Sequence, residues 1–266
     1  MKRKQLFSNP AEIAGIIILV VSALVFAVSQ LTAIIIALFY ILLCFSACFF
    51  PQTNFLLPVI SRGQTGKNLV ALTFDDGPAE PTTRQVLDLL DNYAVKATFF
   101  VSGINALRFP EIIKDIISRG HSIGNHSLNH NPFLMLTSFN NLYREIFDAQ
   151  EILQKMGINT RAFRPPVGIV NPKLYTIMEK SGMFCVTFSC RAFDAGNLHV
   201  KDIASKILKK VKADDIILLH DVSPRRKEDS AALLQEIERL LTGIIDKGLE
   251  IVPLADLINK EVMSNH

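Results

Sequence analysis

The hydrophobic pattern divides the chain into two unlike parts. From residue 13 to residue 50 there is no charged residue, and Leu, Ile, Val, Phe and Ala predominate. As one helix this stretch would be about 57 Å long, far beyond the ~30 Å hydrocarbon core of a bilayer. Polar residues Ser29, Gln30 and Thr32 interrupt it. We therefore expect a membrane anchor over 1–50 with two transmembrane helices, 13–28 and 31–50, joined by a tight turn. One long tilted helix is the alternative.

Beyond a linker at 51–68, which contains Pro and Gly, short apolar runs alternate with amphipathic segments. Such alternation is typical of parallel strands connected by helices. We expect an α/β domain over 69–260. Its strands are predicted at 69–74, 97–101, 163, 184–188, 216–219 and 250–252, and its helices at 82–92, 110–119, 138–156, 172–180, 201–211 and 231–247.

The charges flanking the apolar stretch indicate its orientation. Lys2, Arg3 and Lys4 precede it and favour a cytoplasmic N-terminus. Two spans would then leave the second domain in the cytoplasm, whereas one span would place it outside. Arg62 and Lys67 follow the stretch and favour two spans. A cleaved signal peptide does not fit, because a signal h-region has only about 7–15 residues. We expect an integral protein of the bacterial inner membrane, with its second domain in the cytoplasm.

Composition adds little to this picture. The net charge of +3 over 266 residues is too small to favour a nucleic-acid partner. Four cysteines, two of them in the apolar stretch, give no disulfide framework.

Candidate chemistry begins at the end of the first strand, where residues 73–78 read Thr-Phe-Asp-Asp-Gly-Pro. Two adjacent carboxylates, Asp75 and Asp76, would raise each other's pKa unless a cation separates their roles. A metal ion held by one carboxylate would leave the other free as a base. A solvated Asp-Asp-Gly turn is the alternative.

Residues 126–130, His-Ser-Leu-Asn-His, supply the second signal. His126 and His130 are four residues apart, so we expect them on one face of a helical turn, where they could grip one ion. Imidazole suits zinc, cobalt, nickel or iron, and one carboxylate completes a two-His, one-Asp site. We expect Asp76, His126 and His130 to hold a divalent metal, zinc in the first place. His121 is interpreted as structural.

Three further motifs follow in order. They are Arg-Pro-Pro-Val-Gly at 164–168, Arg-Ala-Phe-Asp-Ala at 191–195 and Ile-Leu-Leu-His at 217–220. With the first two, they make the chain from about 69 to 258 resemble the polysaccharide deacetylases of the NodB-homology type, carbohydrate esterase family 4. The resemblance implies an irregular (β/α) barrel of seven or eight strands, here preceded by a membrane hairpin, with its active site at the C-terminal ends of the strands.

The resemblance also implies a role for each matching residue. Asp75 would be the base for the hydrolytic water, and His220 the acid that protonates the leaving amine. Arg164 would pair with Asp75, and Asp194 would orient His220. The implied substrate-binding residues are Pro166, Val167, Gly168 and Leu219, with a backbone N–H near Val167 facing the oxyanion and the apolar residues before His220 facing the acyl methyl group.

Departures from the family pattern concern the substrate. Val167 stands where an aromatic residue is usual, Ala195 replaces Trp, Arg191 replaces Asp, and the chain contains no Trp. Aromatic faces stack on the sugar rings of an extended polymer, so a small or lipid-linked sugar is favoured over a long polysaccharide. Residues 225–227, Arg-Arg-Lys, are expected either to contact lipid phosphate or to form a solvated loop.

The sequence therefore predicts a membrane-anchored, metal-dependent hydrolase of carbon–nitrogen bonds other than peptide bonds. It would remove an N-acyl group, acetyl in the first place, from an amino sugar of the cell envelope or a polyprenyl-linked sugar. Its partners would be this substrate and membrane lipid, with no nucleic acid. The alternatives are an N-deformylase of a lipid-linked sugar and a catalytically inactive, membrane-anchored carbohydrate-binding domain.

Overall fold

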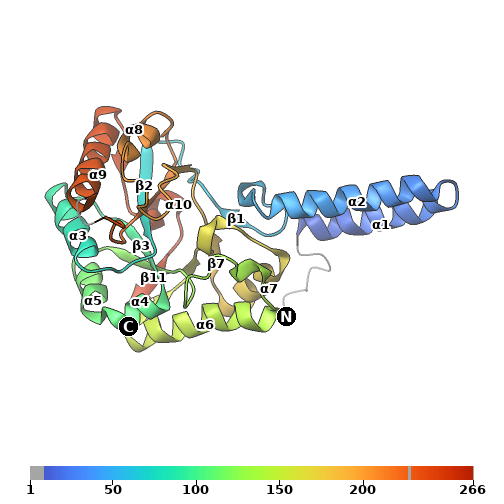
Figure 1. Ribbon diagram of the computed structural model, residues 1–266, viewed down its shortest axis with the longest axis horizontal. Coiled ribbons are helices and arrows are strands. Elements are labelled where there is room, and N and C mark those ends of the chain that lie inside the picture. The colour runs from blue at the N-terminus through green and yellow to red at the C-terminus, as the bar shows by residue number, and fades with distance from the viewer. Residues whose placement is uncertain (1–8, 227–228, 266) are drawn as a thin grey trace.

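A computed structural model describes residues 9–226 and 229–265. Two antiparallel apolar helices, α1 (Pro10–Phe26) and α2 (Gln30–Ala47), form the predicted hairpin and extend as a rod from one side of the second domain (Figure 1). Each begins at a polar cap, because the Asn9 side chain accepts a hydrogen bond from the Glu12 N–H and Ser29 accepts one from Thr32. The helices start and end within three residues of the predicted bounds.

Close packing holds the hairpin together. The Tyr40 hydroxyl of α2 donates a 2.7 Å hydrogen bond to the Ala11 carbonyl of α1. Gly15 makes room for this ring, since a Cβ at that position would lie 2.7 Å from the Tyr40 oxygen. The outward faces carry exposed Ile, Leu, Val and Phe side chains. By length and composition α2 could cross a membrane, and α1 is a shorter apolar helix.

Nine strands of the described residues form one sheet, and every pairing in it is parallel. Eight follow one another in the order β1-β7-β6-β4-β3-β2-β9-β8, and β10 pairs with β2. This is the predicted irregular barrel with one further short strand. The strands are β1 (Val59–Ile60), β2 (Leu69–Asp75), β3 (Thr98–Val101), β4 (Ser122–Asn125), β6 (Ala162–Phe163), β7 (Phe184–Val186), β8 (Cys190–Arg191), β9 (Ile216–His220) and β10 (Glu250–Ile251).

Helices connect the strands and cover the outside of the sheet (Figure 1). They are α3 (Thr82–Asn92), α4 (Gly103–Arg108), α5 (Pro110–Ser118), α6 (Phe139–Lys155), α7 (Pro172–Ser181), α8 (Ile203–Leu208), α9 (Asp229–Asp246) and α10 (Leu254–Ile258). A separate antiparallel pair joins β5 (Ile158–Thr160) to β11 (Met263–Asn265), so the ordered structure continues past the predicted domain end at 260.

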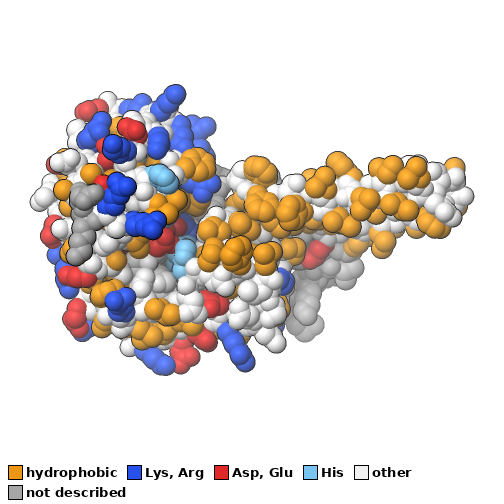
Figure 2. All heavy atoms as spheres, viewed as in Figure 1, with side chains coloured by type: hydrophobic (Ala, Val, Ile, Leu, Met, Phe, Trp, Pro, Cys, Tyr) orange, Lys and Arg blue, Asp and Glu red, His pale blue; other side chains and the backbone are white. Residues whose placement is uncertain are grey.

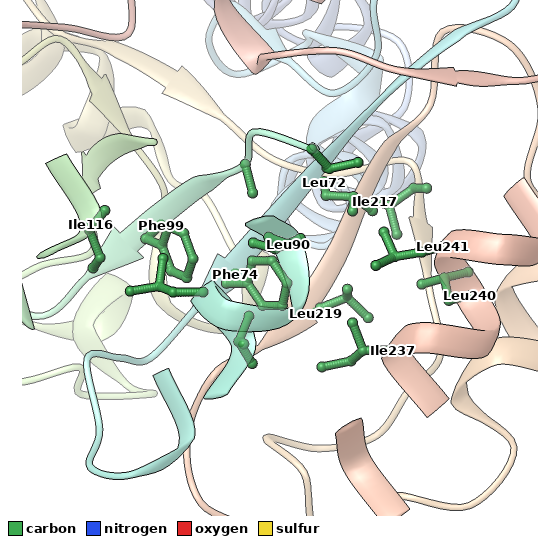
Figure 3. Packing of buried hydrophobic residues seen from close by; sticks show 14 of the residues in the cluster. Leu72, Phe74, Leu90, Phe99, Ile116, Ile217, Leu219, Ile237, Leu240 and Leu241 are labelled. Carbon is green, nitrogen blue, oxygen red and sulfur yellow. The ribbon is translucent and has the colours of Figure 1, made fainter. Parts of the chain in front are cut away.

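The largest core cluster lies between the sheet and these helices. Phe74 of β2 and Phe99 of β3 stack with ring centroids 5.0 Å apart, and Leu219 of β9 faces Ile237 of α9 (Figure 3). Burying such side chains fully contributes about 1.5–3 kcal/mol each. This packing fixes the strands whose ends carry the predicted chemistry.

The prediction of a linker at 51–68 is wrong for its central part. Leu56, Leu57 and Val59 are buried, and β1 pairs with β7 in the barrel sheet. Arg62 then forms an ion pair with Asp215 just before β9. A two-residue strand carries too few alternating positions to be recognised from its pattern.

Candidate metal centre and active site

The polar residues of the motifs gather at one end of the barrel because the strands are parallel and in register. Asp75 is the last residue of β2 and pairs in register with His220, the last residue of β9. Asn125 ends β4 and is followed by the loop that carries both predicted histidine ligands. The C-terminal ends of the strands therefore present the carboxylates and imidazoles to a common cavity of about 540 Å³.

Asp75 and Arg164 form a buried ion pair at the base of this cavity. The Arg164 Nη1 lies 2.6 Å from the Asp75 Oδ1, and it also donates to the Thr73 hydroxyl at 2.8 Å. The guanidinium lies 4.0 Å above the Phe100 ring and is fully buried. Because a buried charge needs a partner, the two side chains hold each other in place.

Asp76, His126 and His130 present one ligand atom each within 4.8 Å of one another. The Asp76 Oδ1 lies 3.3 Å from the His126 Nε2 and 2.9 Å from the His130 Nε2. Burial raises the pKa of Asp76, but hydrogen bonds from both imidazoles outweigh it and hold that pKa well below its usual range. Asp76 is therefore present as a carboxylate.

The surroundings of His126 fit a metal ligand. Its Nδ1 lies 2.8 Å from the Arg164 carbonyl oxygen. Donation of the Nδ1 hydrogen to that carbonyl would make the Nε2 atom, which faces Asp76, available to a cation, and metal-bound histidines are usually oriented in this way. One carboxylate and two imidazoles match the ligand preferences of zinc and of cobalt, nickel or iron.

The two histidines do not lie on a helical turn, so that prediction is wrong. Residues 126–130 form an irregular loop after β4, in which Ser127 and His130 have positive φ angles of 67° and 52°. The Asn125 side chain holds the loop by accepting a hydrogen bond from the Ser127 N–H at 2.9 Å. The loop still brings the imidazole centroids to 4.8 Å from each other.

His220 and Asp194 form a second pair beside Asp75, at the end of the neighbouring strand β9. The His220 Nδ1 lies 2.7 Å from the Asp194 Oδ2, and its Nε2 lies 4.0 Å from the Asp76 Oδ2. Burial lowers the pKa of His220, but the hydrogen bond and charge of Asp194 outweigh this and raise it to about 9. The imidazolium can thus hold a proton beside the metal ligands at neutral pH.

Val167 has an unusual backbone for a β-branched residue. Its φ is 54°, and no hydrogen bond among the described residues uses its N–H. Such a conformation costs on the order of 1–3 kcal/mol and tends to occur at functional sites. Pro166 is buried in the same turn, whereas Val167 and Gly168 line the cavity. The turn therefore presents a free N–H donor at the cavity wall.

The prediction that Leu219 binds substrate is wrong. Side chains of a strand alternate between its two faces, so Leu218 points with His220 into the cavity. Leu219 and Ile217 point to the helices and belong to the core in Figure 3. Leu218 is the apolar residue of this strand that an acyl group would meet.

Two residues near His220 had no motif to reveal them. The Asn197 side chain donates to the carbonyls of His220 and Val222, at 2.9 and 2.8 Å, and so holds the end of β9. Asp221 is buried beneath Gly77 and accepts a 2.7 Å hydrogen bond from Thr83. Burial raises the pKa of Asp221 to about 7.

These residues give the cavity the parts of a hydrolytic site. Asp75 offers a carboxyl group that could act as a base, His220 a charged acid, Val167 a free N–H, and the Asp76 cluster a place for a divalent cation. Charge in such a site is stabilised by groups already oriented before the reaction.

Comparisons with known proteins agree with this geometry. The sequence profile described as polysaccharide deacetylase matches residues 62–186. A peptidoglycan-N-acetylglucosamine deacetylase of Bacillus cereus is 34% identical over 194 residues, which are 72% of this chain and 89% of that protein. A chitooligosaccharide deacetylase of Sinorhizobium fredii is 31% identical over 207 residues, with 73% of this chain and 94% of that protein covered.

Solved structures show the same architecture. The crystal structure of the Bc1960 peptidoglycan N-acetylglucosamine deacetylase, in complex with 4-naphthalen-1-yl-N-oxidanyl-benzamide, superposes with a TM-score of 0.69 at 28% identity. The match covers 77% of this chain and 94% of that one.

Proposed function

The chain belongs to the polysaccharide deacetylase family, and from this premise we propose that it removes the N-acetyl group of an amino sugar. Family membership makes it a hydrolase of carbohydrate N-acyl bonds. The observation that supports the proposal is that one cavity contains both a candidate base beside a candidate metal cluster and a candidate acid with its own partner. Asp75 is held by Arg164 beside the Asp76, His126 and His130 cluster, and His220 faces them with its own carboxylate partner.

The Asp76, His126 and His130 side chains would hold a divalent cation, zinc in the first place. When bound, this cation would supply a Lewis acid that acidifies water and polarises the acyl carbonyl. The remaining work belongs to the side chains. Asp75 would take a proton from water as the water oxygen attacks the acyl carbon, and the Val167 N–H would donate to the developing oxyanion. His220 would give its proton to the nitrogen as the carbon–nitrogen bond breaks, releasing acetate and a free amine.

The apolar hairpin supports a membrane location. Its two helices are antiparallel, so both ends emerge beside the barrel, whether the hairpin crosses the bilayer fully or only enters it. Basic residues that precede α1 favour the cytoplasmic side. We propose that the hairpin anchors the chain and that the barrel lies at the cytoplasmic face, where a lipid-linked sugar would be within reach.

The proposal is tested by offering the purified protein, with its metal content measured, a panel of N-acetylated and N-formylated amino sugars, free and lipid-linked. We expect acetate release from at least one of them. Asp75→Asn should lose this activity by about 10²–10⁴-fold, the contribution of a general base. Asp202→Asn, on the exposed N-terminal side of α8, is the matched control. An Asp75→Asn variant as active as the wild type would refute the proposed base, and formate release alone would favour the deformylase.

A further inference from the structure

The active-site cavity does not end at the barrel mouth. A second cavity of about 620 Å³ adjoins it and reaches Phe49 and Phe50, which follow α2 at the foot of the hairpin. The two cavities share one wall, made of Val167, Gly168, Phe188, Arg191 and Phe193. We call the second cavity the hairpin groove. It connects the apolar anchor with the proposed chemistry.

Arg191 is the charged residue of the shared wall. Its guanidinium carbon lies 4.1 Å from the centroid of the Phe193 ring and 5.1 Å from that of Phe188. The side chain is half-buried, and within residues 9–226 and 229–265 it has no ion pair or hydrogen bond with another residue. Two aromatic faces hold the cation in place but leave its five N–H donors for a ligand.

The charge of the hairpin groove favours an anion. Of the described residues that line it, three are cationic and none is acidic. Arg62 forms an ion pair with Asp215, but Lys210 is exposed and its Nζ lies 5.1 Å from the centroid of the Phe193 ring. Arg191 and Lys210 thus place two positive charges against the same aromatic ring. A bidentate guanidinium beside an ammonium is well suited to phosphate.

The apolar end of the groove indicates where such a phosphate comes from. Phe49 and Phe50 are about half exposed, and the hydrophobic surface of the hairpin continues onto the adjoining face of the barrel, toward the histidines at its mouth (Figure 2). The order along the groove is therefore apolar anchor, cations, then metal ligands. A molecule that matches this order carries a lipid chain, a phosphate ester and an N-acyl sugar.

We propose that the hairpin groove binds the phosphate of a lipid-linked N-acetyl amino sugar, with Arg191 as the residue that determines this specificity. The inference rests on the proposed deacetylase function and adds the substrate class. Arg225 and Arg226 are not among the residues that line the groove. Arg225 and Arg226 line a different hollow with Lys201 and Asp229, and Lys227 lies outside the described residues.

The test compares three substrates of the full-length protein in neutral detergent. They are N-acetylglucosamine joined through phosphate to a prenyl chain, the same sugar and chain joined without phosphate, and soluble N-acetylglucosamine 1-phosphate. Arg191→Gln should lower kcat/KM for the first substrate by about 10–100-fold, mainly through KM, since a charge-assisted hydrogen bond contributes about 1.5–3 kcal/mol. The loss on the neutral glycolipid should be at least ~5-fold smaller. Arg191→Lys should retain part of the kcat/KM for the first substrate that Arg191→Gln loses.

The control is Arg225→Gln, which removes a positive charge from the other hollow. The rates of this variant on all three substrates should stay within about 2-fold of the wild type, because a solvated surface charge contributes little. Equal losses on both lipid substrates in Arg191→Gln would overturn the inference. If the soluble sugar phosphate is turned over as fast as the lipid-linked one, the inference that the substrate carries a lipid chain would be overturned. If the wild type cleaves the neutral glycolipid but gains nothing from phosphate, only this inference fails. If it releases acetate from none of the three, the proposed function fails first.

Discussion

Asp194 determines the protonation of His220. Its carboxylate lies 2.7 Å from the imidazole, and Asn197 donates its backbone N–H to the same oxygen at 3.2 Å. Burial lowers the pKa of His220 and so disfavours the protonated form that an acid needs, whereas the Asp194 carboxylate outweighs this effect and the pKa is raised to about 9. A carboxylate that acts through its hydrogen bond to His220 thus determines over which pH range the proposed acid works.

We expect Asp194→Asn to move the alkaline limb of kcat/KM to lower pH. His220 must be protonated to act as an acid, so activity should fall as pH rises through its pKa, which the protein side chains raise to about 9. A cation at Asp76 opposes the imidazolium charge, so the wild-type limb should lie below that value. Loss of the Asp194 charge should lower it further. The pH profile of acetate release measures the alkaline limb of the wild type and of Asp194→Asn. If the two limbs coincide, Asp194 does not set the pKa of the acid, and the assignment of His220 and Asp194 is contradicted.

Strained backbone conformations at single residues shape the candidate active-site cavity. Asp76, His130 and Val167 have φ angles of 75°, 52° and 54°, in the region that favours glycine. Each costs on the order of 1–3 kcal/mol, which the surrounding packing must outweigh. Sequence patterns show that these residues are polar or apolar, but they do not show that the backbone turns left-handed to aim them.

At the level of elements, the alternating side chains of β9 face the core on one side of the strand and the cavity on the other. Leu219 and Ile217 pack under α9, whereas Leu218 and His220 face the cavity. One strand therefore stabilises the fold with one face and lines the candidate active-site cavity with the other.

Two leucine substitutions test this separation. Leu219→Ala should destabilise the protein by about 2–5 kcal/mol, as expected when a fully packed core leucine is truncated, with little change in kcat/KM of the folded enzyme. Leu218→Ala should instead alter the preference between acetyl and longer acyl groups, since it enlarges the acyl side of the cavity. Chemical denaturation and an acyl-chain series measure the two effects. A change of acyl preference in Leu219→Ala, together with a loss of stability alone in Leu218→Ala, would contradict the strand register.

The same elements show what the sequence can predict. The helices at 82–92 and 138–156 have strong apolar periodicity, and the structure places α3 and α6 within one residue of those bounds. The two-residue strands β1 and β8 lack such periodicity, because their pairing depends on neighbours far along the chain. Residue type and order predict the candidate metal ligands, but their convergence depends on a loop and not on the expected helical turn.

At the scale of the whole molecule, the hairpin and the barrel are firmly joined. The Cys48 carbonyl accepts a hydrogen bond from the Val170 N–H, and Ala11 and Ala47 pack in a cluster with Leu174 of α7. The hairpin therefore holds the groove at a fixed position relative to any membrane it enters.

A reporter fused after the C-terminus tests the orientation. We expect it to lie in the cytoplasm, because a hairpin returns the chain to the side of its basic N-terminus. Removing residues 30–47 leaves one apolar helix and should move the reporter across the membrane. A phosphatase is a suitable reporter because it becomes active only outside the cytoplasm. Phosphatase activity in the fusion with the intact hairpin would contradict the two-helix anchor.

The most direct test of the account is the metal content of three proteins after equilibrium dialysis against zinc. The wild type and Asp75→Asn should each bind about one ion per chain, and His126→Ala should bind it at least ~10-fold more weakly, because two ligands hold the ion much less tightly than three. Equal binding by His126→Ala, or loss of the ion in Asp75→Asn, would contradict the division of the two aspartates into a ligand and a free base.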